Sequence, residues 1–410
     1  MIIGVILFFF LMFLFLSFII SLFSAKRIIK QKDDVFISIL IPCYNEQKNI
    51  RNCLKSIEKT FYDKKLLEVI IIDDGSTDKT ADIANSYLKT SNLDIKLIKG
   101  THQGKSMALN LGLDNAKHEI IMAIDADILL EKETIKKLVS PMSNKNVGAT
   151  NAVAVIQNPK SLIEYFQMIE FSLNNLIRIS FSKTFDNSVW FFGAVACYKK
   201  SVLNKIGRFK TDTLTEDMDI CLELYNNKFK IITVPDARIA TVAMPSVRAL
   251  FKQRMRWYYG ALQSLFKNRN LVQKEFQSLP IIFLFFNQYW WTFFAFVFFP
   301  MTAYQIHYWW PQKTIEAIFY VFRWFSISGP FYVLYKLPDW GLNFLNIFGV
   351  LSGIITLIMS ISAIIIYKAK INYKTVLCLF FYFPYTIIQD AIIVLGVLKY
   401  ISKKKKYFID

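Results

Sequence analysis

The sequence predicts an α/β domain, with a mostly parallel sheet and helices on both faces, joined to a transmembrane helical region. Two observations predict this fold class. Between about residues 35 and 130, short apolar runs alternate with helical patterns, an order that is typical of βαβ units. Long apolar stretches stand toward both ends of the chain, and 54% of its 410 residues are hydrophobic, too many for a purely soluble enzyme.

Residues 1–25 contain the first apolar stretch and are expected to form an uncleaved transmembrane anchor. The run 1–23 exceeds the roughly 20 residues needed to span a bilayer and has no signal-peptide cleavage site. Lys26, Arg27, Lys30 and Lys32 follow at once, so the positive-inside rule places the next segment in the cytoplasm.

The net charge of +18 favours anionic lipid headgroups over nucleic acid as a partner. The basic residues flank apolar spans, and no basic-aromatic nucleic-acid motif is present. The five cysteines form no C-x-x-C pair and only three histidines exist, which argues against structural zinc and a disulfide framework.

Residues 35–245 are expected to form the α/β domain. We predict strands and intervening helices in this order: strands 35–42, 67–73, 94–100 and 119–125, and helices 46–59, 78–88 and 105–115. No glycine-rich dinucleotide or P-loop motif follows the first strand, so a nucleotide site of those kinds is excluded.

Two carboxylates follow the fourth predicted strand. Asp125 and Asp127 stand where a buried parallel strand opens into the crevice that binds ligands in α/β sheets. Oxygen ligands of this kind suit Mg²⁺ or Mn²⁺. A D-x-D motif alone is weak evidence, and the run 217–219 is a second example in this chain.

Polar residues also follow the second strand and begin the helix after the third. Asp73 and Asp74 are expected to contact a ligand, because carboxylates at this edge can accept hydrogen bonds from a uracil ring or a ribose. Asp78 is expected to cap the next helix. Lys105 stands at a helix start, where backbone N–H groups, the helix dipole and an ammonium together suit a phosphate. A solvated surface lysine is the alternative.

Four motifs in this order and spacing carry a resemblance to a known family: P-C-Y-N-E at 42–46, D-D-G-S-T-D at 73–78, G-K-S-M-A-L-N at 104–110 and D-A-D at 125–127. Together they resemble the GT-A domain of family 2 glycosyltransferases over about residues 36–257. The resemblance implies a Rossmann-like GT-A fold in which Asp125 and Asp127 hold a divalent ion, Mg²⁺ or Mn²⁺, on the donor diphosphate. It also implies a nucleotide-sugar pocket lined by Pro42, Tyr44, Glu46, Asp73, Asp74, Lys105 and Asp125.

The run Thr215-Glu216-Asp217 begins a further helical pattern. By the same resemblance, Asp217 is the general base that takes the acceptor's proton, and Glu216 lies beside the acceptor. Ordinary helix initiation by a threonine and first-turn acids is the alternative. Asp219 is expected at the helix surface. Phe192 and Gly193 fall in a region that meets the acceptor in related synthases, although core packing also explains these aromatic residues.

The last motif is Q-x-x-R-W at 253–257. Gln253, Arg256 and Trp257 share one helical face, where the guanidinium can bind a diphosphate bidentately and the indole can form a floor for the acceptor sugar. All three are expected to belong to the nucleotide-sugar site, and Trp257 to the acceptor site as well. After T-E-D, this motif resembles the membrane synthases of cellulose, chitin, hyaluronan and poly-N-acetylglucosamine, and also ceramide glucosyltransferases. Residues 246–278 are expected to form an amphipathic region at the membrane surface.

Residues 279–400 contain four apolar stretches, at about 279–304, 315–335, 342–367 and 375–400, and 401–410 is a basic tail. Five spans in total would make this a multi-pass protein of the cell membrane, with the tail and the α/β domain both cytoplasmic. Polar residues stand at or near membrane depth in these stretches: Asn287, Gln288, Asn346, Gln389 and Asp390. A glycan conduit and hydrogen bonds between helices both explain them.

The sequence thus predicts a membrane-integrated, metal-dependent inverting glycosyltransferase that uses a UDP-sugar, with UDP-N-acetylglucosamine as the leading donor, to extend a β-linked polysaccharide. Its expected partners are the donor, a glycan or lipid acceptor, the bilayer, and export or accessory proteins. Transfer of one sugar to a membrane lipid is the alternative. This chain has Pro245-Ser246 where many polymer synthases have a glutamate after the proline, so processivity is less firmly predicted than transfer. A non-enzymatic transport component is disfavoured because Asp125, Asp127, Asp217 and the Q-x-x-R-W motif are intact together.

Overall fold

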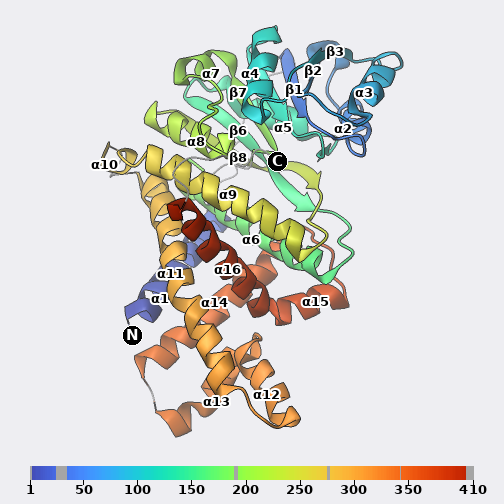
Figure 1. The fold of residues 1–410 in the computed structure, drawn as a ribbon. Helices are drawn as coiled ribbons and strands as arrows, with labels where there is room; N and C mark the ends of the chain where they lie inside the picture. The colour runs from blue at the N-terminus through green and yellow to red at the C-terminus, as the bar shows by residue number, and fades with distance from the viewer. Residues whose placement is uncertain (1, 25–34, 189–192, 275–277, 342, 403–410) are drawn as a thin grey trace.

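The computed structural model describes residues 2–24, 35–188, 193–274, 278–341 and 343–402. A domain built on one sheet lies at one end of the molecule and a group of long helices at the other (Figure 1). Helices α6 (Leu162–Thr184) and α9 (Val247–Lys267) lie between these two parts. The expected basic tail, from residue 403 onward, is outside the described residues.

The sheet has eight strands in the order β3-β2-β1-β4-β7-β6-β8-β5. In the β3-β2-β1-β4 half every pairing is parallel, as predicted, whereas β7 pairs antiparallel with both β4 and β6, and β5 pairs antiparallel with β8. The complete sheet is therefore mixed. The strand bounds are β1 Ile37–Cys43, β2 Leu67–Asp73, β3 Asp94–Lys99, β4 Ile120–Ile124, β5 Leu129–Leu130, β6 Val147–Ile156, β7 Val195–Lys199 and β8 Lys230–Thr241.

Helices cover both faces of the sheet, and alternate strand residues contribute to two separate cores. On one face Leu40 of β1 packs in a cluster with Leu109 of α4, while on the other Ile39 packs in a cluster with Leu54 of α2. This alternation with burial on both sides is typical of parallel sheets. The remaining helices of this domain, with their bounds, are α2 Ile50–Glu58, α3 Thr80–Leu88, α4 Lys105–Asn115, α5 Thr134–Val139, α7 Lys200–Ile206 and α8 Glu216–Asn226, with 3₁₀ turns at Lys64–Leu66 and Ser140–Ser143.

The register of β1 and β2 brings their carboxyl ends to the same level. Cys43 lies opposite Asp73, and the next backbone N–H, that of Asp74, donates to the Cys43 carbonyl at 2.8 Å. The polar residues that follow the two strands therefore meet at one edge of the sheet, as the sequence predicts.

Among the described residues, four helices are long and apolar enough to cross a membrane, or five if one bent pair counts as a single span. The bent pair, α12 and α13, turns by 100° at a break around Ser326, so the stretch predicted at 315–335 is not one straight helix. The stretch at 375–400 is also divided in two. The bounds are α1 Ile2–Phe23, α11 Leu279–Trp309, α12 Thr314–Trp324, α13 Ser328–Trp340, α14 Phe344–Ile366, α15 Tyr373–Phe380 and α16 Tyr382–Ser402, with a short α10 at Leu271–Lys274.

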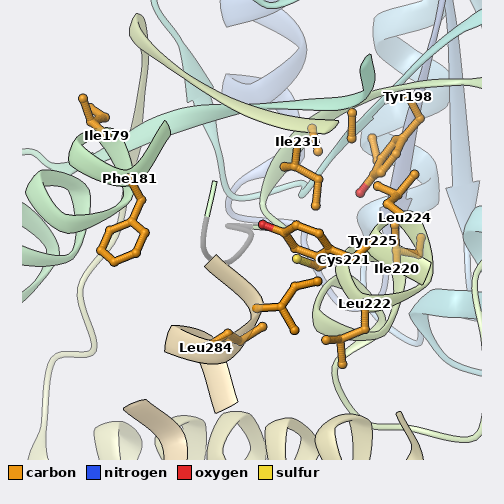
Figure 2. Close-up of a cluster of buried hydrophobic side chains, with 14 of the residues drawn as sticks. Ile179, Phe181, Tyr198, Ile220, Cys221, Leu222, Leu224, Tyr225, Ile231 and Leu284 are labelled. Atoms are coloured by element: carbon orange, nitrogen blue, oxygen red, sulfur yellow. The ribbon is translucent and has the colours of Figure 1, made fainter. Parts of the chain in front are cut away.

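One hydrophobic core joins the sheet domain to the apolar helices. Figure 2 shows Cys221 and Tyr225 of α8 beside Ile231 of β8, with Leu284 of α11 on the side away from the sheet. The same cluster includes Phe10 of α1. Because side chains of both parts interdigitate in it, the two parts pack as one unit.

Candidate functional site

The residues predicted from the D-x-D motif lie directly after β4. The loop that carries them is anchored on two sides, because the Asp125 N–H donates to the Ala194 carbonyl at 2.9 Å and the Asp125 carbonyl accepts from the Cys53 thiol at 3.8 Å. Asp125 and Asp127 are both half-buried. The structure therefore places these two carboxylates in a loop that is hydrogen-bonded to its neighbours and still reaches solvent.

Lys105 connects this loop to a second carboxylate from a distant part of the chain. Its Nζ lies 2.7 Å from Asp125 Oδ1 and 2.7 Å from Glu216 Oε1. Burial lowers the pKa of the Lys105 ammonium, but the two carboxylates outweigh burial and raise it. Lys105 is the first residue of α4, after Gly104 at φ +92°, so it is held at a helix N-terminus as predicted.

The pKa values of both carboxyls in the loop after β4 are raised. Burial raises the pKa of Asp125 to about 6 against the lowering effect of Lys105, and burial with the nearby Glu46 carboxylate raises the pKa of Asp127. Negative charge in this loop is thus incompletely neutralised by the protein.

A divalent cation fits this donor set. No group of three or more His, Cys, Asp or Glu residues able to hold a metal occurs in the described part of the chain. Mg²⁺, however, is commonly held by one or two carboxylates together with substrate phosphates, and two underneutralised aspartates match that pattern. Asp125 and Asp127 are therefore the candidate ligands.

The residues after β1 form an aromatic surface near the same edge. Pro42 lies within β1, and the ring of Tyr44 stacks on the ring of His102 with centroids 3.9 Å apart and planes at 20°. Glu46 accepts a hydrogen bond from Asn49 at 2.7 Å, and burial raises its pKa. His102 was not predicted, because nothing local links it to a tyrosine 58 positions earlier.

Asp73 and Asp74 are buried and bind the chain's own backbone. Asp74 accepts hydrogen bonds from the N–H groups of Gln103 at 2.9 Å and Gly104 at 2.8 Å, and Asp73 accepts one from Ser76 at 3.1 Å. Their visible role is to shape the loops that carry His102 and Lys105. Direct contact of these carboxylates with a ligand stays a prediction. Asp78 accepts from the N–H of Thr80, the first residue of α3, at 2.9 Å, although the N-cap position itself is taken by Lys79.

Asp217 lies in the first turn of α8 and is oriented by backbone groups. Its Oδ2 accepts from the Gly193 N–H at 3.1 Å and its Oδ1 from the Met218 N–H at 2.8 Å. Burial, reinforced by the neighbouring Glu216 carboxylate, raises the pKa of Asp217 to about 6. Burial would raise the pKa of Glu216 as well, but Lys105 outweighs it and lowers that pKa. Lys105 thus gives the two adjacent carboxyls different pKa values.

Gly193 is required where it stands. A Cβ atom there would lie 2.5 Å from the Asp217 Cβ and 2.6 Å from its Oδ2, closer than real contacts allow. Phe192, the other residue predicted from this region, lies outside the described residues. Thr215 takes the N-cap position of α8 without a side-chain cap, and Glu216 and Asp217 stand in the first turn, so the structure has the first-turn acids of ordinary helix initiation but not its capping hydrogen bond.

The Q-x-x-R-W residues lie on α9 with different degrees of burial. Gln253 and Trp257 are half-buried and Arg256 is exposed, while the charge of Arg256 contributes to the lowered pKa of Glu216. Helix α9 packs closely on α8, because a Cβ at Gly260 would lie 2.6 Å from the Thr215 methyl group. The structure thus brings this helix next to the T-E-D residues.

Two residues missed or misplaced by sequence reasoning lie nearby. Arg254, not Arg256, is the buried arginine of α9, and its Nη2 lies 3.0 Å from Glu170 Oε2 of α6. Asp219 was predicted at the helix surface, and this is wrong: it is fully buried, 2.8 Å from Lys267 Nζ and 3.1 Å from Asn268 Nδ2. The physical reason is that the C-terminal end of α9 covers it, which no local pattern reveals.

Residues 38–207 match the family model described as Glycosyl transferase family 2. The chain contains a glycosyl transferase family 2 domain. The matched segment includes Lys105, Asp125 and Asp127, whereas Asp217 and the α9 residues follow it.

The curated relatives of this chain include synthases of one polysaccharide. The poly-beta-1,6-N-acetyl-D-glucosamine synthase of Staphylococcus epidermidis is 32% identical over 236 residues, covering 57% of this chain and 56% of that protein. The synthase of the same name from Staphylococcus aureus strain COL is 30% identical over 255 residues, covering 62% and 60%. The chain thus spans less than two thirds of the length of these relatives.

The arrangement of the family 2 domain and the apolar helices also resembles a solved structure. This is the mannosyltransferase PcManGT from Pyrobaculum calidifontis in complex with GDP-Man and Mn²⁺, with a TM-score of 0.58 and 20% identity, covering 98% of this chain and all of that one. The likeness shows the fold, a GT-A-like mixed sheet with attached helices, across both parts of the molecule.

Proposed function

We propose that this chain is a membrane-integrated inverting glycosyltransferase that transfers N-acetylglucosamine from UDP-N-acetylglucosamine to the end of a growing β-linked polysaccharide. The observation that carries the proposal is the Lys105 bridge from Asp125 to Glu216. Through this bridge, Lys105 and Asp125, which suit a departing diphosphate, are joined to Glu216. Glu216 directly precedes Asp217, whose carboxyl is suited to activate an incoming hydroxyl. The sugar and the polymer follow from the names of the relatives.

The donor side has groups for the diphosphate and for the nucleobase of a nucleotide sugar. Asp125 and Asp127 would hold Mg²⁺ or Mn²⁺, which when bound neutralises charge on the leaving diphosphate. Lys105, released from its carboxylates, can donate to a phosphate oxygen. The Tyr44–His102 stack offers an aromatic surface to the nucleobase of the donor. We assign the exposed Arg256 guanidinium to the diphosphate as well.

The acceptor side is organised around Asp217. As the acceptor oxygen bonds to the sugar C1 and the bond from C1 to the UDP oxygen breaks, the acceptor proton passes to Asp217. A carboxyl with a raised pKa is a better base than an ordinary aspartate, and the Gly193 and Met218 N–H groups keep it oriented. We assign the Trp257 ring to the floor beneath the acceptor sugar.

The apolar helices set where the reaction occurs. Four or five of them can cross a bilayer, and the basic residues after the first favour a cytoplasmic family 2 domain in the cell membrane. Donor would then enter from the cytosol, and the product would pass to the membrane or to export proteins.

The test is product analysis with detergent-purified full-length protein, a panel of radiolabelled UDP-sugars and Mg²⁺ or Mn²⁺, with Asp127→Ala as the blank. Large labelled material from UDP-N-acetylglucosamine, released by a β-1,6-specific glycanase, supports the proposal. A single-sugar product that partitions into organic solvent would make the acceptor a lipid and overturn the polymer assignment. If no UDP-sugar releases UDP, the enzymatic proposal fails.

A further inference from the structure

A buried polar cluster joins three helices that are distant in sequence. The Glu170 carboxylate of α6 lies 3.0 Å from Arg254 Nη2 of α9 and also accepts hydrogen bonds from the Tyr385 hydroxyl and, at 3.3 Å, from Gln389 Nε2, both of α16. Arg254 and Tyr385 are buried. One carboxylate oxygen thus connects the α/β domain with a helix long and apolar enough to cross the membrane.

The Arg254 guanidinium of this cluster also contacts an aromatic ring of the candidate site. Arg254 Cζ lies 4.3 Å from the centroid of the Trp257 ring and 5.7 Å from that of Phe171. Cation–π attraction strengthens when both groups are removed from water, as the Arg254 side chain is here. The orientation of the Trp257 ring is therefore tied to the position of the guanidinium.

Stability alone explains this cluster poorly. Buried ion pairs are often no more stabilising than apolar side chains of the same volume. The Nε of Arg254 is buried with no hydrogen-bond partner in the part of the chain that the structure describes. A cluster that keeps a charge buried with one donor unused adds little to the stability of the fold. Its hydrogen bonds do, however, fix the orientation of the Arg254 side chain, which apolar packing would not.

We propose that Glu170 and Tyr385 are positioning residues for acceptor binding: they orient Arg254, and Arg254 holds the Trp257 ring at the angle that receives the acceptor sugar. This inference rests on the proposed function, in which Trp257 forms the acceptor floor. It makes acceptor binding depend on how α16 packs against α9. Most of the residues assigned to the donor follow β1, β2 and β4 and lie on other elements, and Arg256, the donor residue on α9, is exposed and outside the cluster.

The test compares two assays on the full-length protein: release of UDP from UDP-N-acetylglucosamine by water, and transfer to soluble N-acetylglucosamine oligosaccharides. In Tyr385→Phe and Glu170→Gln the acceptor KM should rise at least tenfold, because the Trp257 ring loses its orientation. A misplacement of about 1 Å in a binding or reacting group can lower the rate about 100-fold. Hydrolysis should stay within twofold of wild type. Tyr382→Phe is the matched control, because its ring lies 5.6 Å from that of Tyr385 and its hydroxyl makes no hydrogen bond among the described residues.

A double-variant experiment separates positioning from general packing. In a Trp257→Ala background, Tyr385→Phe should change the acceptor KM no further, because the ring it orients is gone. An equal additional loss in that background, or a parallel fall of hydrolysis and transfer in Tyr385→Phe alone, would overturn the proposal. Failure of wild-type protein to release UDP would instead contradict the proposed function, and the hydrolysis assay shows this before any variant is made.

Discussion

The Lys105 ammonium lies 2.7 Å from the Glu216 carboxylate, although 111 positions separate the two residues. Lys105 begins the helix after β3, and Glu216 begins the helix that carries Asp217. The contact joins the residues that we assign to the donor to those that we assign to the acceptor. It also explains why Glu216 remains ionised while the adjacent Asp217 has a raised pKa.

Replacing the bridging lysine should disable the donor side. Lys105→Ala leaves Asp125 and Glu216 without their shared cation, and we expect kcat/KM for the UDP-sugar to fall about 10- to 100-fold, since charged hydrogen bonds contribute about 1.5–3 kcal/mol. Steady-state UDP release measures this. Lys137→Ala removes the cation of a surface pair with Glu133 and should leave the rate unchanged. Equal rates for Lys105→Ala and wild type would remove Lys105 from the donor site.

Activity should decline on the acid side of pH 6. Burial raises the pKa of Asp217 to about 6, so the carboxyl is protonated below that pH and cannot accept a proton. We expect kcat/KM to fall about tenfold for each pH unit below 6 at saturating metal, with a slope nearer two at low metal, where Asp125 also loses its charge. A pH profile between 5 and 8 that stays flat would contradict the assignment of the base.

Adding one methyl group beside the base should be severe. In Gly193→Ala the new Cβ would lie 2.5 Å from the Asp217 Cβ, so the carboxyl must move. Misplacement of a reacting group by about an ångström can cost about 100-fold in rate, and we expect kcat to fall by that order. Gly349→Ala is the control, because no atom lies within 4 Å of its added Cβ. Wild-type kcat in Gly193→Ala would show that Asp217 tolerates displacement.

The buried aspartate that sequence reasoning misplaced should matter for stability. Asp219→Asn weakens the contact with Lys267, and we expect the free energy of unfolding to fall by about 1–3 kcal/mol. Asp212 pairs with the same Lys267 from an exposed position, so Asp212→Asn should cost under about 1 kcal/mol. Thermal unfolding in one detergent compares the two variants. Equal losses would contradict the distinction between the buried and the exposed partner.

Local pattern was sufficient for the elements that carry the donor residues. The run 67–73 is β2 and the run 105–115 is α4, both with the predicted bounds, because their apolar spacing, terminal acids and helix-start glycine all act within a few residues. Asp125 and Lys105 were expected in one pocket only from the family resemblance, and the structure brings them to 2.7 Å from each other.

Other features of the structure depend on residues that are far apart in the sequence, so no local pattern predicts them. Arg254 and Arg256 are two positions apart on one helix, and only the remote Glu170 and Tyr385 decide which guanidinium is buried. Strand β7 inserts antiparallel between β4 and β6, although it lies more than 70 positions after β4, and the Asp125 N–H donates to the carbonyl of Ala194 just before it. Tertiary contacts of this kind also buried Asp219 and stacked His102 on Tyr44.

The most direct test of the central claim uses Asp217→Asn, which preserves the shape of the side chain and removes its basicity. Transfer from UDP-N-acetylglucosamine and binding of UDP are measured on the same purified sample, the latter by calorimetry with Mg²⁺ or Mn²⁺. The account predicts that transfer is abolished while UDP binds with wild-type affinity, because Lys105, Asp125 and Asp127 are unchanged. Retained turnover in Asp217→Asn would contradict it.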